Sequence, residues 1–308
     1  MKFWAGVTDN RWWEFLSTRG VDEVNFWQPS PKPLFKTLPA GTPFLFKLRR
    51  PNNHIAGGGF FVKYSRLPLP VAWEAFREKN GAASLQELEQ LIRPLAPDSR
   101  SPTLEIGCTV LNSPFFFARN EWIPCPQSWG ASIMRGKTYD TQESGGRELW
   151  EAVQARLRSS PAVAAEPDPA AYAPAQYGQP YLSRSRLGQG AFRVLVTEAY
   201  KKRCAITGES TLPVLEAAHI QPFSQAGANH PRNGLLLRSD FHKLFDLGLV
   251  SVSPEMKVKV SPRIRDQWFN GKAYYRLDGQ PLAVMPDDPG DHPDPALLRW
   301  HSTERFAA

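Results

Sequence analysis

The sequence predicts an α+β protein built from two domains. Three observations carry this prediction. Short apolar runs separated by glycine and proline fill the first half, a proline- and alanine-rich stretch without hydrophobic periodicity follows, and the last third has a helix, strand, loop, strand, helix pattern. A chain of 308 residues is long enough for two cores of ordinary size. We therefore expect domains at 1–158 and 186–308, joined by a linker at 159–185.

The first domain is expected to be rich in strands. Its apolar runs are EVNFW at 23–27, TPFLFKL at 42–48 and GGFFVKY at 58–64. Two helices are predicted between them, near 10–18 and 84–92, the second because leucines recur at helical spacing. The segment that follows the first domain, SSPAVAAEPDPAAYAPAQYGQPYL at 159–182, has the composition of a semi-extended linker.

The second domain is expected to begin with a helix at 190–203 whose apolar residues share one face. A strand ending at Ile220, a polar loop to Pro231 and a strand at 234–238 follow. The next segment predicts a helix from about Asp240 to Leu247, and LVSVSPEMKVKVSP predicts a pair of strands. The pattern places two strands directly before a helix.

Composition narrows the class of partner and compartment. The formal charge of +7 and pI near 9.4 favour an acidic partner such as nucleic acid. The three cysteines lie far apart with no CxxC pair, which argues against a disulfide framework and a cysteine-built zinc site. Asp9 and Arg11 interrupt any signal peptide, and no segment has the apolar length of a membrane helix. A cytoplasmic protein without membrane association is expected.

One histidine, one asparagine and a second histidine are spaced as in a metal-dependent nuclease. Asn233 follows His219 by fourteen residues, and His242 follows nine later. With the segments LEAAHIQP, NGLLL and DFHKLFDLGL, this spacing resembles the HNH endonuclease family over roughly residues 186–308. The resemblance implies a ββα-metal fold and phosphodiester hydrolysis with one divalent ion, Mg²⁺ or Mn²⁺ first, with Co²⁺, Ni²⁺ or Zn²⁺ as alternatives. It also implies that His219 is the general base, that Asn233 orients the loop and the base, and that His242 holds the metal.

Helix geometry adds a second metal-ligand candidate. Residues four apart share a helix face, so Asp246 can reach the same ion as His242, whereas Asp240 points away. The sequence departs from the family pattern at Ala218, where most members carry a metal-binding Asp or His. Glu216, two residues earlier on the strand, could replace that ligand, and His230 in the loop is a second substitute. Simpler interpretations remain open. His219 could be a buried structural histidine, His242 and Asp246 could be an exposed helical pair, and Glu216 and His230 could be solvated surface residues.

The first domain resembles another family, less specifically. The segments GVTDNRWWEFL, DEVNFWQPS, PAGTPFLFKLRRPNNHIAGGGFF and WEAFREKNGA are similar to PUA-like β-barrels, closest to the EVE branch related to YTH and SRA modules, over roughly 1–155. The resemblance implies a β-barrel with an aromatic pocket that holds a modified base. The pocket candidates are Trp27, Asn25, Phe26, Asp9 and Trp12. Core packing for the aromatic residues and a helix cap for Asp9 are the alternatives.

Together the two resemblances imply a modification-dependent restriction endonuclease. The first domain would bind 5-methylcytosine or 5-hydroxymethylcytosine in double-stranded DNA, and the second would cut the strand. A homodimer or transient pairing on DNA is expected, because cutting both strands needs two sites. A nicking or repair nuclease without modification dependence and a catalytically silent DNA-binding protein are the alternatives. Basic residues expected to contact DNA phosphates are Lys201, Lys202, Arg203, Lys243 and Arg193.

Overall fold

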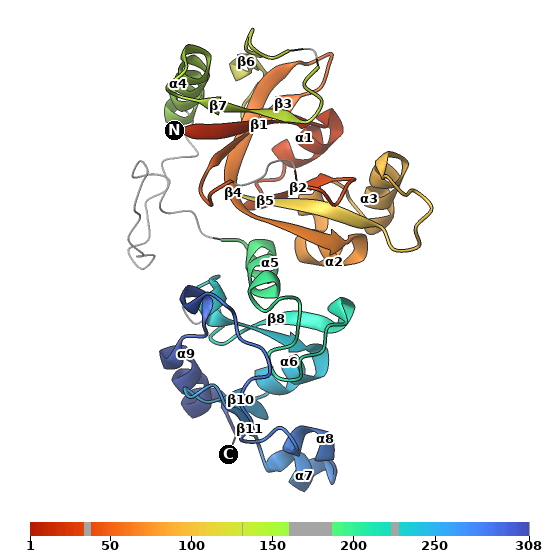
Figure 1. The fold of residues 1–308 in the computed structure, drawn as a ribbon, viewed down its shortest axis with the longest axis vertical. Coiled ribbons are helices and arrows are strands. Elements are labelled where there is room, and N and C mark those ends of the chain that lie inside the picture. Colours follow the sequence, from red (N-terminus) through yellow and green to blue (C-terminus); the bar gives the residue numbers. More distant parts are fainter. Residues whose placement is uncertain (34–37, 131, 160–186, 223–227, 308) are drawn as a thin grey trace. The chain divides into compact units, whose positions relative to one another are not determined.

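Two structural units, Met1–Gly188 and Gln189–Ala308, divide the chain in the computed structural model. The structure describes residues 1–33, 38–130, 132–159, 187–222 and 228–307 (Figure 1). The linker expected at 159–185 lies outside the described residues, except for Ser159, which ends a helix. No helix in the described ranges has the length and apolar character needed to cross a membrane.

A large mixed sheet forms the N-terminal unit. Its strand order is β2-β5-β4-β3-β1-β7, with β6 paired to β4. β1 and β3 are parallel, and the other pairs are antiparallel. The strands are β1 (Lys2–Thr8), β2 (Glu23–Gln28), β3 (Pro43–Leu48), β4 (His54–Pro68), β5 (Glu105–Phe116), β6 (Ile123–Pro124) and β7 (Gly136–Asp140). The apolar runs at 23–27, 42–48 and 58–64 therefore form strands, as predicted.

Strand β4 bends the sheet. Its pairing with β5 shifts register twice, between Gly58 and Phe60 and between Phe61 and Lys63, and such bulges increase the local twist. A glycine is required at Gly57, where φ is +149° and an added Cβ would lie 2.2 Å from the Phe115 carbonyl oxygen. Among the described residues, however, β7 and β2 remain the two ends of the strand order. The described strands thus form a mixed sheet that does not close, and the expected PUA-like β-barrel is not confirmed: the strand-forming pattern in the sequence did not reveal which edges stay unpaired.

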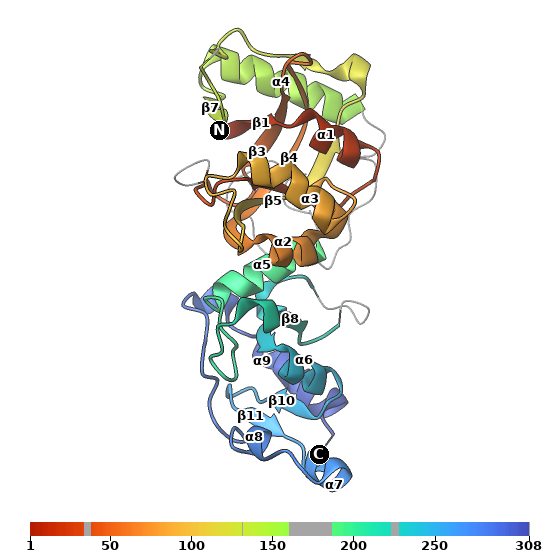
Figure 2. The same cartoon turned by 90° about the vertical axis from the view of Figure 1, so that its right-hand side faces the viewer.

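Side-chain alternation gives this sheet an apolar layer on each face. On β1, Phe3 and Ala5 belong to one buried cluster and Trp4 to the other. Helix α4 (Ser144–Ser159) covers the first cluster, and α1 (Asn10–Ser17) covers the second with two tryptophans and a leucine (Figure 2). The remaining helices of the unit are α2 (Leu69–Phe76) and α3 (Leu85–Ile92). The sequence predicted α1 and α3 but not β1, β5, β6, β7, α2 or α4.

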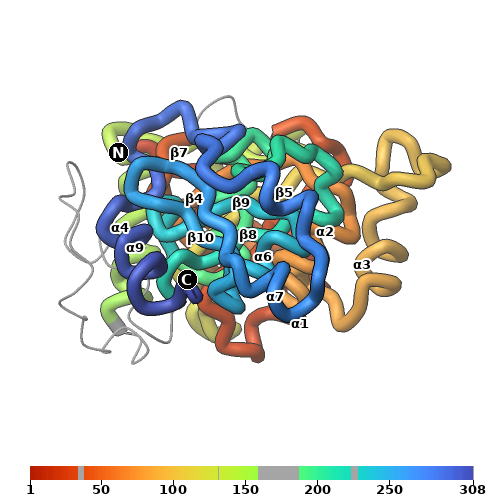
Figure 3. Tube along the Cα trace, turned by 90° about the horizontal axis from the view of Figure 1, so that it is seen from below, coloured from red at the N-terminus to blue at the C-terminus, as the bar shows by residue number. Residues whose placement is uncertain are grey.

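The C-terminal unit has its own apolar core around a two-stranded sheet and a helix. Strands β8 and β9 pair antiparallel, and α6 follows β9 directly and contacts both (Figure 3). A second hairpin, β10 with β11, extends the core, as predicted. The elements are α5 (Gln189–Ala199), β8 (Leu215–His219), β9 (Gly234–Arg238), α6 (Ser239–Asp246), β10 (Val250–Val252), β11 (Val258–Val260), α7 (Arg263–Trp268), α8 (Lys272–Tyr275) and α9 (Pro295–Trp300).

Candidate active site

The β8, β9 and α6 elements form a rigid support for polar side chains. Leu235, Leu236 and Leu237 on β9 are fully buried, and Phe241 and Phe245 anchor α6 in the same core. These apolar contacts fix the helix against both strands. The polar residues of β8 and α6 that lie beside the anchors are therefore held at defined positions.

His219 ends β8 and is held by two neighbours. Its ring stacks on Phe192 of α5, with centroids 3.9 Å apart and an interplanar angle of 11°. The ring Nε2 and Asn229 Oδ1 are 2.8 Å apart. Burial lowers the pKa of His219 below 6.5, and the charge of His242 acts in the same direction, while Asn229 and Asp246 oppose it. The neutral ring is favoured.

Asn233 fastens the loop that follows β8. Its side chain is 2% exposed. Oδ1 accepts a hydrogen bond from the Gln221 N–H at 2.9 Å, and Nδ2 donates to the carbonyls of Gln221 at 2.9 Å and Ala228 at 3.0 Å. Its backbone carbonyl also accepts from the Ile220 N–H. The residue next to Ala228 is Asn229, so Asn233 fixes the start and end of the loop that brings Asn229 to His219.

His242 lies between two carboxylates. Its Nδ1 is 2.5 Å from Glu216 Oε2, and its Nε2 is 3.5 Å from Asp246 Oδ2. Glu216 comes from β8 and Asp246 from the last position of α6. The structure thus brings together the three residues expected to hold a metal, with one carboxylate at each ring nitrogen.

The other ligand candidates are occupied elsewhere. Ala218 is fully buried in the apolar core. His230 Nδ1 accepts a hydrogen bond from the Arg232 N–H at 3.2 Å. Asp240 binds Arg238 through two contacts of 2.7 Å, and these hydrogen bonds hold the pKa of Asp240 below its ordinary value.

The donor set fits a hard divalent ion with few protein ligands. Imidazole nitrogen and carboxylate oxygen suit divalent first-row metals, and carboxylate suits Mg²⁺. Among the described residues, no group of three or more His, Cys, Asp or Glu side chains is arranged to hold an ion. Such an ion would therefore keep water or substrate oxygens as its remaining ligands.

The basic residues differ in their surroundings. Lys201 Nζ lies 2.6 Å from Asp287 and Lys202 Nζ lies 3.3 Å from Glu198, while Arg203 Nε donates to the Gly208 carbonyl. Arg193 on α5 is half-buried. Lys243 is exposed on α6, next to His242, and no ion pair to it is found in the described part of the chain. Of the five basic candidates, Lys243 is the one nearest in sequence to His242.

Three of the five pocket candidates in the N-terminal unit are core residues. Asn25 is fully buried and donates to Asn80 Oδ1 at 2.8 Å. Trp12 and Phe26 are 4% and 7% exposed and pack edge to face. Trp12 and Phe26 belong to one buried apolar cluster, which agrees with the core-packing alternative for these two residues.

The other two candidates are more accessible. Trp27 is half-buried, and its Nε1 donates to the Asn80 carbonyl at 2.9 Å, which fixes the indole plane. Asp9 caps α1 by accepting hydrogen bonds from the N–H groups of Arg11 and Trp12, and it pairs with Arg49 at 3.4 Å. The helix-cap alternative for Asp9 is thus seen directly.

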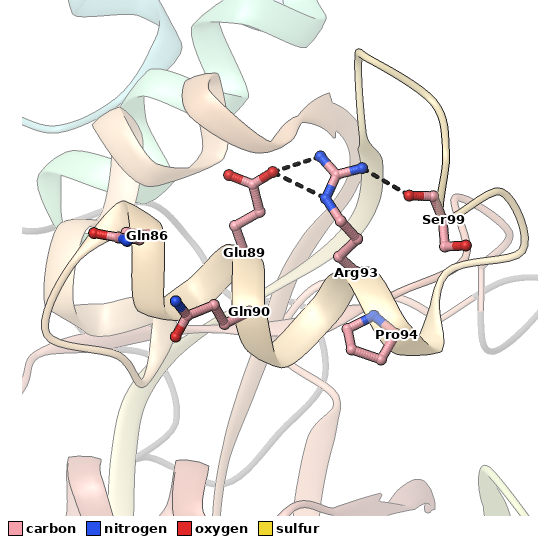
Figure 4. A pocket seen from close by; sticks show the side chains of 6 residues that line it. All are labelled: Gln86, Glu89, Gln90, Arg93, Pro94 and Ser99. Atoms are coloured by element: carbon pink, nitrogen blue, oxygen red, sulfur yellow. Dashed lines mark hydrogen bonds and ion pairs between the residues drawn. The ribbon is translucent and has the colours of Figure 1, made fainter.

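A hollow on α3 offers no comparable chemistry. Its polar groups bond to one another: Arg93 contacts Glu89 and donates to the Ser99 carbonyl at 2.8 Å (Figure 4). The side chains around it are Gln86, Glu89, Gln90, Arg93, Pro94 and Ser99. Nothing there would activate a water or a phosphate.

Sequence reasoning missed two residues that support His219. Phe192 was expected only as a core residue of the first helix, and Asn229 had no assigned role. The sequence holds no signal for the stack, since Phe192 lies 27 residues before His219. Asn229, close to Asn233 in a polar loop, could have been singled out as a partner for the histidine.

An antiparallel β8–β9 pair followed by α6, with histidines at the end of the first strand and on the helix, defines a ββα-metal nuclease domain. In agreement, the family model described as HNH endonuclease matches residues 204–253. The chain therefore carries an HNH endonuclease domain, and members of this class use a divalent metal.

Comparisons beyond this domain are sparse. Three chains of solved structures match, one of them described as "Modification dependent TagI restriction endonuclease". That match has 22% identity and a TM-score of 0.27, and it covers 38% of this chain and 37% of the other. No curated protein matches the sequence.

Proposed function

We propose that the protein is a modification-dependent DNA endonuclease. Its HNH domain hydrolyses phosphodiester bonds, and its N-terminal unit binds double-stranded DNA at a modified cytosine, 5-methylcytosine or 5-hydroxymethylcytosine. The observation that carries the nuclease part is the placement, within the matched family segment, of His219 at the end of β8 and of the His242–Asp246 pair on α6, which packs against that strand. The net charge of +7 supports a nucleic-acid substrate.

His219 acts as the general base. Hydrolysis needs a group that takes a proton from water, and a neutral imidazole can do so. Burial keeps the pKa of His219 low, so the ring is neutral at physiological pH. Because Nε2 faces the Asn229 carbonyl oxygen, Nε2 carries the hydrogen and Nδ1 is left to accept the proton. Phe192 fixes the ring plane, and Asn233 positions the loop that carries Asn229.

His242 and Asp246 would hold the divalent ion, and Glu216 is the remaining ligand candidate. A bound ion supplies positive charge that stabilises the phosphorane-like transition state and the leaving oxygen. Lys243, on the exposed side of α6, contacts a phosphate of the bound strand. Lys201, Lys202, Arg203 and Arg193 remain secondary candidates for backbone contacts.

The N-terminal unit acts as a PUA-like reader related to the EVE branch. Its half-buried Trp27 provides a stacking surface of the kind that holds an extruded base, and Asp9 with Arg49 lies at the start of α1. Binding at a modified base would raise the effective concentration of the nuclease domain near that site. A dimer or a transient pair of molecules would supply the second cut.

A comparison of plasmids tests both parts of the proposal. One plasmid sequence is prepared unmodified, with 5-methylcytosine and with 5-hydroxymethylcytosine, and is incubated with the protein and Mg²⁺ or Mn²⁺. We expect at least one modified form to be cut and the unmodified form to be spared. Equal cutting of all three would leave a nicking or repair nuclease without modification dependence.

Ala218 favours a second candidate, a catalytically silent DNA-binding protein. The position is fully buried and provides no ligand. A parallel assay with His219→Ala decides between the two, because removal of a general base lowers the rate by about 10²- to 10⁴-fold. Cleavage at the parental rate by His219→Ala would exclude His219 as the base, and no cleavage by the parent with any metal would support the silent protein.

A further inference from the structure

The two carboxylates beside His242 are not equivalent. Glu216 lies 2.5 Å from Nδ1, whereas Asp246 lies 3.5 Å from Nε2. The two nitrogens of an imidazole point in different directions, and a metal takes one of them while the other donates a hydrogen bond. A single ion bound at one nitrogen of His242 therefore cannot involve both carboxylates in the same way.

The distances from the two carboxylates to the ring of His242 indicate which ring nitrogen can bind the ion. Ligand atoms at about 2.1 Å from one ion are separated by about 3.0 Å in octahedral and about 3.4 Å in tetrahedral geometry. The 3.5 Å between Nε2 and Asp246 Oδ2 is close to that separation. The 2.5 Å between Nδ1 and Glu216 Oε2 is too short for two ligands of one ion and matches a hydrogen bond.

The surroundings of His219 agree with this choice. The charges of His242 and Asp246 both act on the pKa of His219, which indicates that this pair lies near the proposed base. A metal there would lie near the group that activates water. Glu216 sits on the opposite ring nitrogen, on the strand that carries fully buried Ala218.

We propose that Glu216 is a positioning residue rather than a metal ligand. It accepts a hydrogen bond from Nδ1–H of His242, which fixes the tautomer and directs the Nε2 lone pair toward an ion shared with Asp246. In this way the chain operates without a ligand at Ala218: the strand carboxylate orients the helical histidine, and water and DNA oxygens complete the ion's shell. This inference rests on the proposed function for its metal.

Direct metal binding tests the assignment without DNA. The full-length protein is titrated with Mn²⁺ alone, by calorimetry or by the loss of the free-ion EPR signal. Asp246→Ala should lower the affinity by more than 100-fold, whereas Glu216→Ala should lower it about 10- to 100-fold, as loss of a partner to a ligating histidine does. Glu216→Gln should stay within a few-fold of the parent, because its amide oxygen still accepts from Nδ1–H.

A matched control and a fold check accompany these variants. Asp266→Asn removes one exposed carboxylate from the same unit, far in sequence from the site, and should leave Mn²⁺ affinity unchanged. Glu216 and Asp246 are 45% and 58% exposed, so their substitution should preserve the fold, which circular dichroism verifies.

The tautomer gives a second readout that a ligand role would not predict. In the metal-free protein, at a pH well above the ordinary histidine value of about 6.5, ¹⁵N NMR should show the His242 proton on Nδ1 in the parent and in Glu216→Gln, and a mixture of tautomers in Glu216→Ala. A parental proton on Nε2, or equal loss of Mn²⁺ binding in Glu216→Ala and Asp246→Ala, would overturn the assignment. Unchanged binding in Glu216→Ala would overturn it as well.

Different results would contradict the nuclease function and the positioning role of Glu216. A protein that shows this order of Mn²⁺ affinities but cuts no DNA would contradict the nuclease function and leave the positioning role intact. A protein that cuts DNA while Glu216→Ala binds Mn²⁺ as the parent does would contradict only the positioning role.

Discussion

A group that accepts a proton from water must be unprotonated when the reaction occurs. At His219 the main influence is burial, which lowers the pKa below 6.5, and the Asn229 contact partly offsets it. Because the pKa of the histidine is lowered, the ring stays neutral to a lower pH than a free histidine. The residue therefore has the environment of a base that is ready at neutral pH.

This environment predicts the pH dependence of cleavage. The rate should fall as the pH drops through the lowered pKa, so the acidic limb of kcat/KM should have its midpoint below 6.5. Asn229→Ala removes an interaction that raises the pKa and should move the midpoint lower still. A limb centred above 6.5, or one that Asn229→Ala moves upward, would contradict this role for His219.

At the scale of elements, the loop between β8 and β9 depends on one amide. Asn233→Ala would leave the Gln221 N–H and two carbonyls without their partner, and we expect a loss of about 3 kcal/mol in unfolding free energy. Urea denaturation measures this change. Asn229→Ala is the matched control: it should cost less than about 1 kcal/mol while still changing the pH profile. Equal stability of the two variants would contradict the role of Asn233.

A buried histidine outside the matched family segment also packs against α6. His301, 2% exposed, stacks on Phe245 with centroids 3.7 Å apart and bonds Ser251 Oγ through Nδ1 at 2.9 Å. Burial lowers its pKa to about 4. The folded protein thus binds fewer protons at this residue than the unfolded chain between about pH 4 and 6.5.

Stability should therefore decrease as the pH falls through that window. The shift corresponds to at most about 3 kcal/mol of unfolding free energy, lost between pH 6.5 and about 4. Denaturation at several pH values measures it. His301→Gln should reduce this acid sensitivity, and His292→Gln, at a half-buried position in the same unit, should retain it. Equal sensitivity in both variants would exclude His301 as its source.

The parts of the fold and of the site that depend on residues close in sequence could be predicted. The strand and helix around Asn233 and His242 follow from apolar spacing, and helix periodicity alone placed Asp246 beside His242. The pairing of Phe192 with His219 and of His301 with Phe245 depends on chain segments that meet only in the folded core. In the N-terminal unit the sequence of β2 is compatible with both a pocket and a core; the structure buries Asn25 and Phe26 and leaves Trp27 half-buried.

At the scale of the whole molecule, the excess of seven positive charges should make DNA binding depend strongly on salt. Lys243→Gln removes one exposed cation beside the site, so the slope of log K against log salt should become shallower by about one. Binding measured at several salt concentrations gives the slope. Lys272→Gln on α8 is the control and should leave it unchanged; an unchanged slope in Lys243→Gln would remove Lys243 from the interface.

The stack between Phe192 and His219 also bears on what a minimal nuclease could be. The segment that matches the HNH family, 204–253, contains both histidines, the asparagine and both carboxylates. It contains neither Phe192, on which the ring of His219 stacks, nor His301, which stacks on Phe245 of α6. A fragment cut at those bounds would keep the proposed catalytic and metal-binding residues and lose both stacking partners, so we expect a working fragment to include α5 and His301.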